Sequence, residues 1–338
     1  MRRFFVAALI VAATATLHAW DYEGHRIVNE LALDALPNDF PAFAKTPEAR
    51  ERIAFLGGEA DRWRNSTNLA ARHDTAPEHF IDIDDLTNYG LTQAQLPPFR
   101  YDFAVMMGEG RVKHPEHFTS IDPLKNTDHT RELIGFLPWA INGYYAKLES
   151  GFSYLKALEE AGTRDEVANA RQNIIYIMGV MGHFPGDAAQ PLHTTKHFNG
   201  WVGPNPNNYR TNHTIHGWID GGFIRATGIK ASELKVNMRQ ARAIWDQSPT
   251  NVFGEALKFI NEQHTLVEKV YIMDRDGALS PRNEKANEGR EFIGKQLVKG
   301  GQFLSDLWYS AWRNAPPDKF LIGELKKRNA AKAGENTR

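Results

Sequence analysis

The sequence contains no cysteine, so disulfide bonds cannot stabilise the fold, which must rely on core packing and on any bound metal. It also lacks a charge excess: the formal net charge is −1, and charged residues make up 24% of the chain. A near-neutral chain has no general attraction for nucleic acid or for a basic partner, so affinity for an anion has to be local. Motifs of zinc proteases, serine hydrolases and phosphate-binding glycine loops are absent as well.

Long apolar runs are missing after the N-terminus. Residues 4–15 are apolar, follow the basic pair Arg2 and Arg3, and are too short to span a bilayer as a mature helix. We therefore expect residues 1–19 to be a signal peptide, and the mature protein to be secreted or periplasmic without stable membrane association. The alternative is an N-terminal anchor helix, which the polar character of residues 20–23 disfavours.

Alternation of apolar and polar residues with period two is almost absent, whereas helical periodicity is common. The cap, proline and acid at Thr46, Pro47 and Glu48 predict the start of one helix. Other helices are expected over residues 24–36, 128–158 with an interruption at Pro138, 163–189, 231–247, 252–273 and 284–312. Loops are expected over 97–127 and 198–214, and a flexible polar tail over 326–338. The predicted fold class is a single all-α domain over residues 20–325.

Pairs of histidine and aspartate four residues apart carry the strongest chemical signal. His183 and Asp187 share one face of the expected helix, and His193 follows just after the proline that should end it. His216 and Asp220 repeat the spacing. An isolated pair of this kind is more often a surface ion pair. Two pairs together with His193 favour a zinc site, because imidazole and carboxylate groups on adjacent turns are typical zinc ligands.

Two further segments place candidate ligands among aromatic and basic residues. Asp61 precedes Arg64 by three residues, and His79 is followed by Phe80 and Asp82. Each segment is weak evidence alone, because Asp61 could cap a helix and His79 could be a buried structural histidine.

Cleavage after residue 19 would make Trp20 the first residue of the mature chain. Its α-amino nitrogen and its carbonyl oxygen could then chelate a metal ion in a five-membered ring. His25 follows at the start of the first expected helix. The alternative is that Trp20 is only the first aromatic residue of the core.

Taken in order, these residues resemble the zinc-dependent single-strand nucleases of fungi and plants, whose fold is shared by bacterial zinc phospholipase C. The family pattern is an N-terminal Trp, an early His, an Asp, a His, His-x3-Asp-x5-His and a final His-x3-Asp. The positions that match it are Trp20, His25, Asp61, His79, His183, Asp187, His193, His216 and Asp220. The phrase Gly-Asp-x-x-Gln-Pro-Leu-His over 186–193 is characteristic of the family, and the resemblance covers about residues 20–312.

The resemblance implies three zinc ions. The first would be held by Asp61, His79, His183 and Asp187, the second by His193, His216 and Asp220, and the third by Trp20, His25 and the bridging Asp187. It also implies hydrolysis of single-stranded DNA or RNA to 5′-nucleotides by a metal-activated water. No protein partner is implied.

The metal ligands alone do not separate a nuclease from a phospholipase C. The resemblance implies that Arg64, at a position where the nucleases carry an arginine, stabilises the negative charge of the transition state. Asp61 and Asp187 are the other predicted catalytic residues. Phe80 and Asp82 match positions that stack and hydrogen-bond a base, although phospholipases carry a similar segment. The alternatives are therefore a zinc phospholipase C and a non-catalytic exported zinc-binding protein.

Residues 115–118 have the same sequence as residues 77–80, Pro-Glu-His-Phe, so His117 could replace His79 as a ligand. His79 is preferred because Asp82 follows it, as in the family. His197 and His213 are expected to be loop or supporting residues.

Three features depart from the family pattern. The fungal relatives use disulfides, which a chain without cysteine cannot form. Residues 80–182 form a longer stretch than in the fungal enzymes and are expected to reshape the substrate groove. Pro185 lies between two ligands and is expected to bend the helix that carries them.

Overall fold

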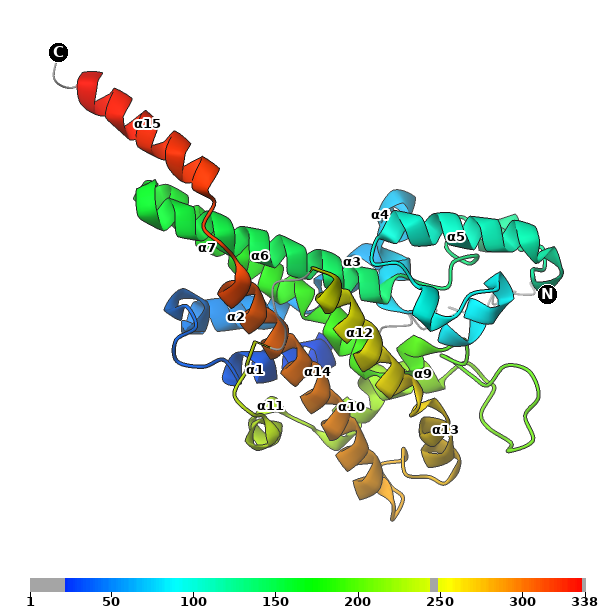
Figure 1. Cartoon of the computed structure of the whole chain (residues 1–338). Coiled ribbons are helices and arrows are strands. Elements are labelled where there is room, and N and C mark those ends of the chain that lie inside the picture. Colours follow the sequence, from blue (N-terminus) through cyan, green and yellow to red (C-terminus); the bar gives the residue numbers. More distant parts are fainter. Residues whose placement is uncertain (1–21, 244–248, 336–338) are drawn as a thin grey trace, which may run out of the picture.

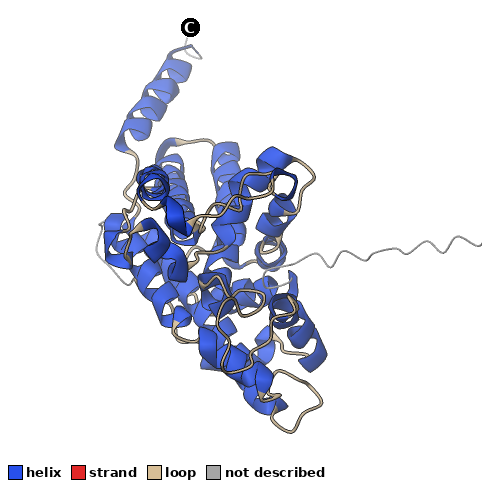
Figure 2. Cartoon of the chain, turned by 90° about the vertical axis from the view of Figure 1, so that its right-hand side faces the viewer, coloured by secondary structure: helices blue, strands red, loops and turns tan. Residues whose placement is uncertain are grey.

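A 29-residue helix, α14 (Ala286–Asn314), runs through the middle of the structure (Figure 1). The computed structural model describes residues 22–243 and 249–335. Helix α14 packs against α1 (Tyr22–Asp34), α6 (Leu137–Ala161) and α8 (His183–Ala189). Within the described residues no strand forms, and Ile81 and Gly135 make only an isolated bridge (Figure 2). The all-α prediction is therefore confirmed.

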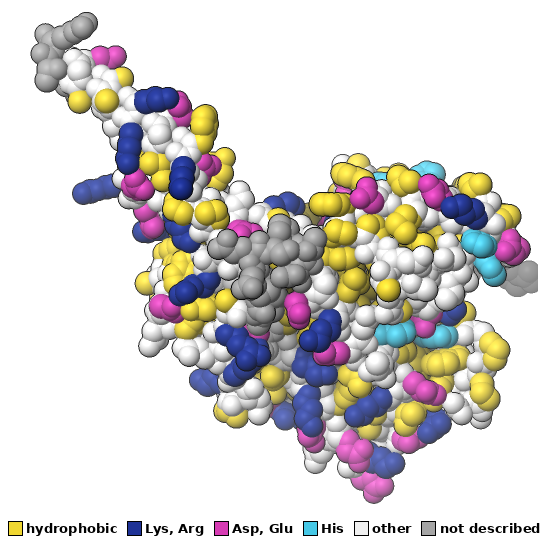
Figure 3. All heavy atoms as spheres, in the orientation of Figure 1, with side chains coloured by type: hydrophobic (Ala, Val, Ile, Leu, Met, Phe, Trp, Pro, Cys, Tyr) yellow, Lys and Arg dark blue, Asp and Glu magenta, His cyan; other side chains and the backbone are white. Residues whose placement is uncertain are grey.

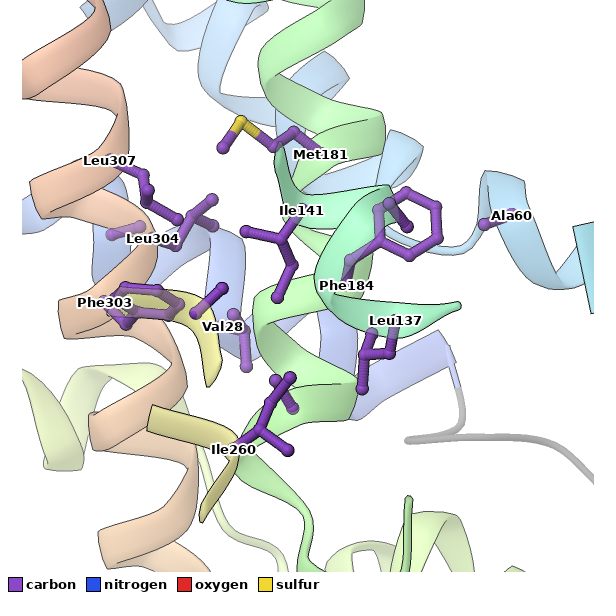
Figure 4. Close-up of a cluster of buried hydrophobic side chains, with 14 of the residues drawn as sticks. Val28, Ala60, Leu137, Ile141, Met181, Phe184, Ile260, Phe303, Leu304 and Leu307 are labelled. Atoms are coloured by element: carbon purple, nitrogen blue, oxygen red, sulfur yellow. The ribbon is translucent and has the colours of Figure 1, made fainter. Parts of the chain in front are cut away.

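Helix α14 carries an apolar stripe at helical spacing that faces the core. Figure 4 shows Phe303, Leu304 and Leu307 of this stripe beside Val28 of α1 and Ile141 of α6. These side chains are buried, so the interior between the three helices is apolar. Burial of this surface supplies the main stabilisation that a chain without disulfides requires.

Two glycines let the ligand-bearing helices approach α14 closely. A Cβ at Gly301 would lie 2.8 Å from the Cβ of Leu31 in α1, and one at Gly300 would lie 3.1 Å from the Cβ of Ala189 in α8. Any larger residue at either position would push a helix outward. The approach of α1 and α8 to the same helix brings their candidate ligands together.

Helices α6 and α7 (Arg164–Met181) run side by side (Figure 1). The turn between them is closed by a capping box, in which Thr163 and Glu166 satisfy each other's backbone N–H groups. Helix α2 (Pro47–Leu56) packs on α7 and starts as predicted, because the Thr46 hydroxyl accepts from the Ala49 N–H.

Shorter helices complete the chain. They are α3 (Glu59–Arg64), α4 (Leu69–Thr75), α5 (Arg100–Lys113), α9 (Ile215–Gly217), α10 (Phe223–Thr227), α11 (Ala231–Leu234), α12 (Pro249–His264), α13 (Val267–Arg275) and α15 (Lys319–Glu335). A π-helical segment, Trp218–Gly222, joins α9 to α10. None of the helices that the structure describes is long and apolar enough to cross a membrane.

The helix predicted over residues 163–189 is divided in the structure. Helix α7 ends and α8 begins around Gly182, which lies directly against Asn29 of α1. The break lies within the turn before Pro185, which agrees with the prediction that this proline interrupts the helix. Pro185 lies in the first turn of α8, so its missing N–H costs no hydrogen bond within α8, but it cannot donate to the carbonyl of Met181 at the end of α7.

The helix predicted over residues 231–247 forms only in part. Within residues 231–243, α11 and a short 3₁₀ turn form and the rest is non-helical, whereas residues 244–247 lie outside the described residues. The chain after the 3₁₀ turn is held by tertiary contacts instead. The Arg239 guanidinium pairs with Asp306 of α14, and the Ala241 N–H donates to Ala35. The single helix predicted over residues 252–273 is two helices in the structure, because α12 ends at His264 and α13 begins at Val267.

Residues 97–127, predicted as a loop, contain the 14-residue helix α5. Its buried stripe is narrow, comprising Phe103, Met107 and Gly110, which explains the weak periodicity. The helix predicted from residue 128 starts instead at Leu137, with the adjacent proline in its first turn. The tail predicted from residue 326 is helical to Glu335, because α15 continues through it (Figure 1).

Charged side chains of both signs are interspersed over the face shown in Figure 3. This face therefore has no broad excess of positive charge to attract an anion. A specific pocket has to supply one.

We predict that Gly182→Ala lowers the free energy of unfolding by roughly 1–3 kcal/mol, because the added methyl overpacks the core. Its Cβ would lie 1.6 Å from Oδ1 of the buried Asn29, whose amide nitrogen donates to the carbonyls of Ile53 and Gly179. Urea unfolding measures the change. Gly143→Ala in α6 is the control, because its Cβ meets nothing within 4 Å. Equal stability of the two variants would contradict the close contact.

Candidate metal centre

The carboxylate of Asp187 lies at the centre of four imidazoles. Its oxygens are 3.1 Å from His79 Nδ1, 3.2 Å from His183 Nε2, 3.5 Å from His25 Nε2 and 3.7 Å from His193 Nδ1. All five side chains are buried. They come from α1, α8 and the 3₁₀ turns Ala76–His79 and Pro191–Thr194, so the site exists only in the folded chain.

Asp61 of α3 lies beside the same group. Its Oδ1 is 3.9 Å from His79 Nδ1 and 4.0 Å from His183 Nε2. The Arg64 Nε lies 3.1 Å from the same carboxylate oxygen, one turn further along the helix. The structure thus brings the Asp61-x-x-Arg64 segment to the cluster, as the resemblance implies.

A second group consists of His193, His216 and Asp220. His216 Nε2 is 2.9 Å from Asp220 Oδ2, and His193 Nε2 is 3.9 Å from the same oxygen. Asp220 sits in the π-helical segment, a distortion that is frequent at functional sites. The predicted pairing of His216 with Asp220 across one turn is therefore present.

Backbone carbonyls set the orientation of three imidazoles. The Nδ1 atoms of His183, His193 and His216 donate to the carbonyls of Gly57 (2.7 Å), His79 (2.6 Å) and Phe198 (3.2 Å). The Nε2 atom of each ring then faces the carboxylates, where it could donate a lone pair to a metal ion. This arrangement is typical of metal-ligating histidines, whose second nitrogen is held by a carbonyl or carboxylate.

Several buried polar atoms of the group make no hydrogen bond within the described part of the chain. They are both ring nitrogens of His25, Nε2 of His79 and of His193, and Oδ1 of Asp187. In addition, His183 Nε2 and His79 Nδ1 lie only 2.8 Å apart. Leaving such atoms unsatisfied costs about 1–3 kcal/mol each, and metal ions would satisfy them. The donor set therefore fits metal binding.

The ionisation of the cluster also suits metal binding. Burial holds the pKa of His25 and His79 well below the ordinary value, so their rings are neutral at neutral pH. Burial would raise the pKa of Asp187, but the imidazoles of His183 and His193 outweigh it and keep that pKa well below its usual range. Burial likewise opposes the charge on His193, yet Asp187 and Asp220 raise its pKa to about 9. A metal ion would replace the proton held there.

The described residues contain three buried triads whose ligand atoms lie within 4.8 Å of one another. The triads are His25, Asp61 and His183; His79, His183 and Asp187; and His193, His216 and Asp220. Together they contain every predicted ligand except Trp20, which lies outside the described residues. The protein can therefore hold metal ions in these clusters.

His117, the alternative to His79, belongs to a different and exposed cluster with His114 and Glu116. His197 stacks on Trp201 with ring centroids 4.1 Å apart, and its side chain is half-buried. His213 is exposed and adopts a positive φ of 57°. These three histidines are not part of the buried triads.

A pocket of about 490 Å³ adjoins the triads and is lined by His193 and His216. Arg64, Phe80 and Asp82 line it as well, so the structure brings the predicted substrate-binding residues to the metal cluster. Burial, together with the neighbouring Asp85 and Asp84, raises the pKa of Asp82 to about 8. At neutral pH this carboxyl is mostly protonated and contributes little negative charge to the pocket.

One buried residue of the site received no role from the sequence. The Gln190 Nε2 donates to Asp220 Oδ1 at 2.8 Å, and its Oε1 accepts from the Leu192 N–H at 2.7 Å. Gln190 thus orients Asp220 and caps the turn that carries His193. Its position within the characteristic segment Gly-Asp-x-x-Gln-Pro-Leu-His over residues 186–193 was the sequence signal that could have indicated this role.

Comparison with protein-family models and with curated protein sequences found no match to this chain. The chemistry available to the site therefore follows from the buried triads and the adjoining pocket.

We predict that Asp187→Asn loses most of the bound metal, because this carboxylate faces four of the imidazoles. Metal per chain, measured by elemental mass spectrometry after dialysis, should fall together with the melting temperature. His117→Ala is the matched control, and its metal content should stay within error of the parent. Retention of full metal by Asp187→Asn would contradict the assignment.

Proposed function

We propose that the protein is a zinc-dependent phosphodiesterase that cleaves single-stranded DNA or RNA to 5′-nucleotides. The observation that carries this proposal is the direct adjacency of the buried triads to a pocket with cationic and aromatic walls. The resemblance to the zinc-dependent nucleases supports the same reading. The proposal includes export, with removal of residues 1–19.

Imidazole and carboxylate donors are characteristic zinc ligands. Asp61, His79, His183 and Asp187 would hold one ion, and His193, His216 and Asp220 a second. Trp20 and His25 would hold a third with Asp187, and the two unbonded ring nitrogens of His25 support this ion. When bound, zinc would supply Lewis acidity toward a phosphate and would lower the pKa of water to about 7.

Arg64 would stabilise the negative charge that develops on the phosphoryl oxygens. Its Nε is held at 3.1 Å from Asp61, which fixes the planar guanidinium beside the triads. A fixed cation in a largely buried site costs no reorganisation during the reaction and is worth more than one in water. Lysine at this position would lack the fork geometry that matches a phosphate.

Aromatic side chains give the pocket affinity for bases. Phe80 and Phe198 both line it, and Phe198 contacts the His216 ring at 5.7 Å between centroids. Stacking of a base on an aromatic ring contributes about 1–3 kcal/mol and tolerates any base. The protonated carboxyl of Asp82 would donate a hydrogen bond to an acceptor on the base edge.

The proposal is tested with the mature chain starting at Trp20, loaded with zinc and assayed with and without a chelator. Single-stranded DNA, single-stranded RNA and phosphatidylcholine are the substrates. Chelator-sensitive release of 5′-mononucleotides with intact lipid supports the nuclease. Cleavage of lipid alone establishes the phospholipase C alternative, and stoichiometric zinc without any turnover establishes the non-catalytic alternative.

We predict that Arg64→Gln lowers kcat by about 10²- to 10³-fold, as expected for the loss of one transition-state donor. Zinc content should remain that of the parent, because Arg64 supplies no metal ligand. Arg62→Gln on the same helix is the control, since Arg62 pairs with Glu59 at the surface. Equal kcat values for the two variants would exclude a role for Arg64 in the reaction.

A second prediction concerns the N-terminus. A chain that begins at Trp20 should bind one more zinc ion than a chain that retains residue 19, because an acylated nitrogen cannot serve as an amine ligand. Elemental mass spectrometry of the two purified forms measures the difference. Equal zinc content would remove Trp20 from the ligand set.

A further inference from the structure

The pocket extends beyond the ligand-bearing elements onto residues 122–133. This segment belongs to the long stretch 80–182, in which the sequence departs from the family pattern. The lining residues that it contributes are Lys125, Thr127, Asp128, Thr130, Arg131 and Leu133. One wall of the pocket is therefore formed by residues that supply none of the predicted metal ligands.

This segment is closed by its own hydrogen bonds. The buried Asn126 donates from Nδ2 to Glu132 Oε2 at 2.5 Å and accepts on Oδ1 from the Arg131 N–H at 3.1 Å. Asn126 therefore holds the two ends of a tight loop together. Lys125 precedes the loop and Arg131 ends it, so both cations project from a braced backbone.

Asp128 fastens the same loop to helix α4. Its Oδ2 pairs with Arg72 Nη2 at 2.7 Å, and its carbonyl accepts from His73 Nδ1 at 2.8 Å. The Thr130 hydroxyl donates to Asp128 Oδ1 at 2.9 Å. The wall is thus ordered before any ligand binds, which reduces the entropic cost of binding.

The pocket contains four cationic side chains, and their charges are not equivalent. Arg64 faces Asp61, and Arg72 is paired with Asp128. Lys125 and Arg131 are exposed, and neither forms an ion pair with any carboxylate among residues 22–243 and 249–335. The carboxylates that line the pocket are Asp82 and Asp128. Because Asp128 is already paired with Arg72, the wall around Lys125 and Arg131 remains positive.

We propose that Lys125 and Arg131 form a second phosphate-binding point, which takes a phosphate of the substrate strand next to the one that is cleaved. The proposal rests on the proposed function, because Arg64 and the metal ligands are reserved there for the scissile phosphate. An exposed lysine and arginine on an ordered loop are suited to bind a phosphate oxyanion. The protein would therefore favour substrates with several phosphates over substrates with one.

The expected substrate class is an oligonucleotide rather than a dinucleotide or a choline lipid. Phosphatidylcholine has a single phosphate and a cationic headgroup, so Lys125 and Arg131 would add nothing to its binding. The preference for length would come from residues 122–133 and not from the metal cluster.

The test compares the zinc-loaded mature chain with the double variant Lys125→Gln/Arg131→Gln. An octathymidylate and the dinucleotide TpT, which has one phosphodiester, are the substrates for kcat/KM. A fluorescent octathymidylate with cleavage-resistant phosphorothioate linkages reports binding between low and moderate salt. Lys113→Gln is the control, because Lys113 is exposed on α5 and does not line the pocket.

We expect the loss of kcat/KM for the octamer to exceed the loss for TpT by at least about tenfold. The slope of log affinity against log salt should fall by about 0.7, because each phosphate contact on a single strand contributes about 0.7 and the two side chains bind one phosphate. Equal losses for the two substrates, or an unchanged salt slope, would overturn the second phosphate-binding point.

The binding measurement separates this proposal from the proposed function. If the parent protein cleaves neither substrate, the nuclease assignment fails. A salt slope that still falls in the double variant, but not in Lys113→Gln, then supports the phosphate-binding point by itself. If the parent cleaves both substrates and the double variant matches it, the phosphate-binding point fails and the nuclease assignment stands.

Discussion

The buried carboxylate of Asp187 is the group on which the rest of the site depends. It is fully enclosed and lies within 3.7 Å of four imidazoles that come from separate segments of the chain. A buried charge is tolerated only when it is compensated, and here protons or metal ions between the rings and the carboxylate provide the compensation. Folding therefore has to deliver all of these segments to one point.

The helical framework meets this requirement through close contacts with α14 and α1. Gly300 and Gly301 allow α8 and α1 to lie directly on α14, and Gly182 allows the end of α7 to lie on Asn29. Asn29 in turn ties α1 to the backbones of α2 and α7. The same contacts that bury the apolar core thus also set the positions of His25 and His183.

Charge is organised locally rather than over the whole surface. The chain is close to neutral, and yet one pocket gathers four cationic side chains beside the buried triads. The raised pKa of Asp82 removes a negative charge from this pocket at neutral pH. Lys125 and Arg131 are far in sequence from the residues of the buried triads, so this wall of the pocket can change without altering the triads.

Sequence alone determined the helical class and eight of the candidate ligands that the described structure brings together. Apolar residues at helical spacing predict long helices such as α14. The four-residue spacing of His216 and Asp220 predicts their contact directly. Both signals are local, and local geometry is sufficient to interpret them. Trp20 stays a prediction, because it lies outside the described residues.

Only the tertiary structure decided where helices stop and which side chains share the pocket. Gly182, at the break between α7 and α8, packs on Asn29 of another helix, and the non-helical chain beyond the 3₁₀ turn after α11 is held by Asp306 of α14. Likewise, Lys125 reaches the pocket because Asp128 is fastened to α4. Each of these outcomes comes from contacts between residues distant in sequence, whose energies outweigh the small local preferences that a sequence pattern records.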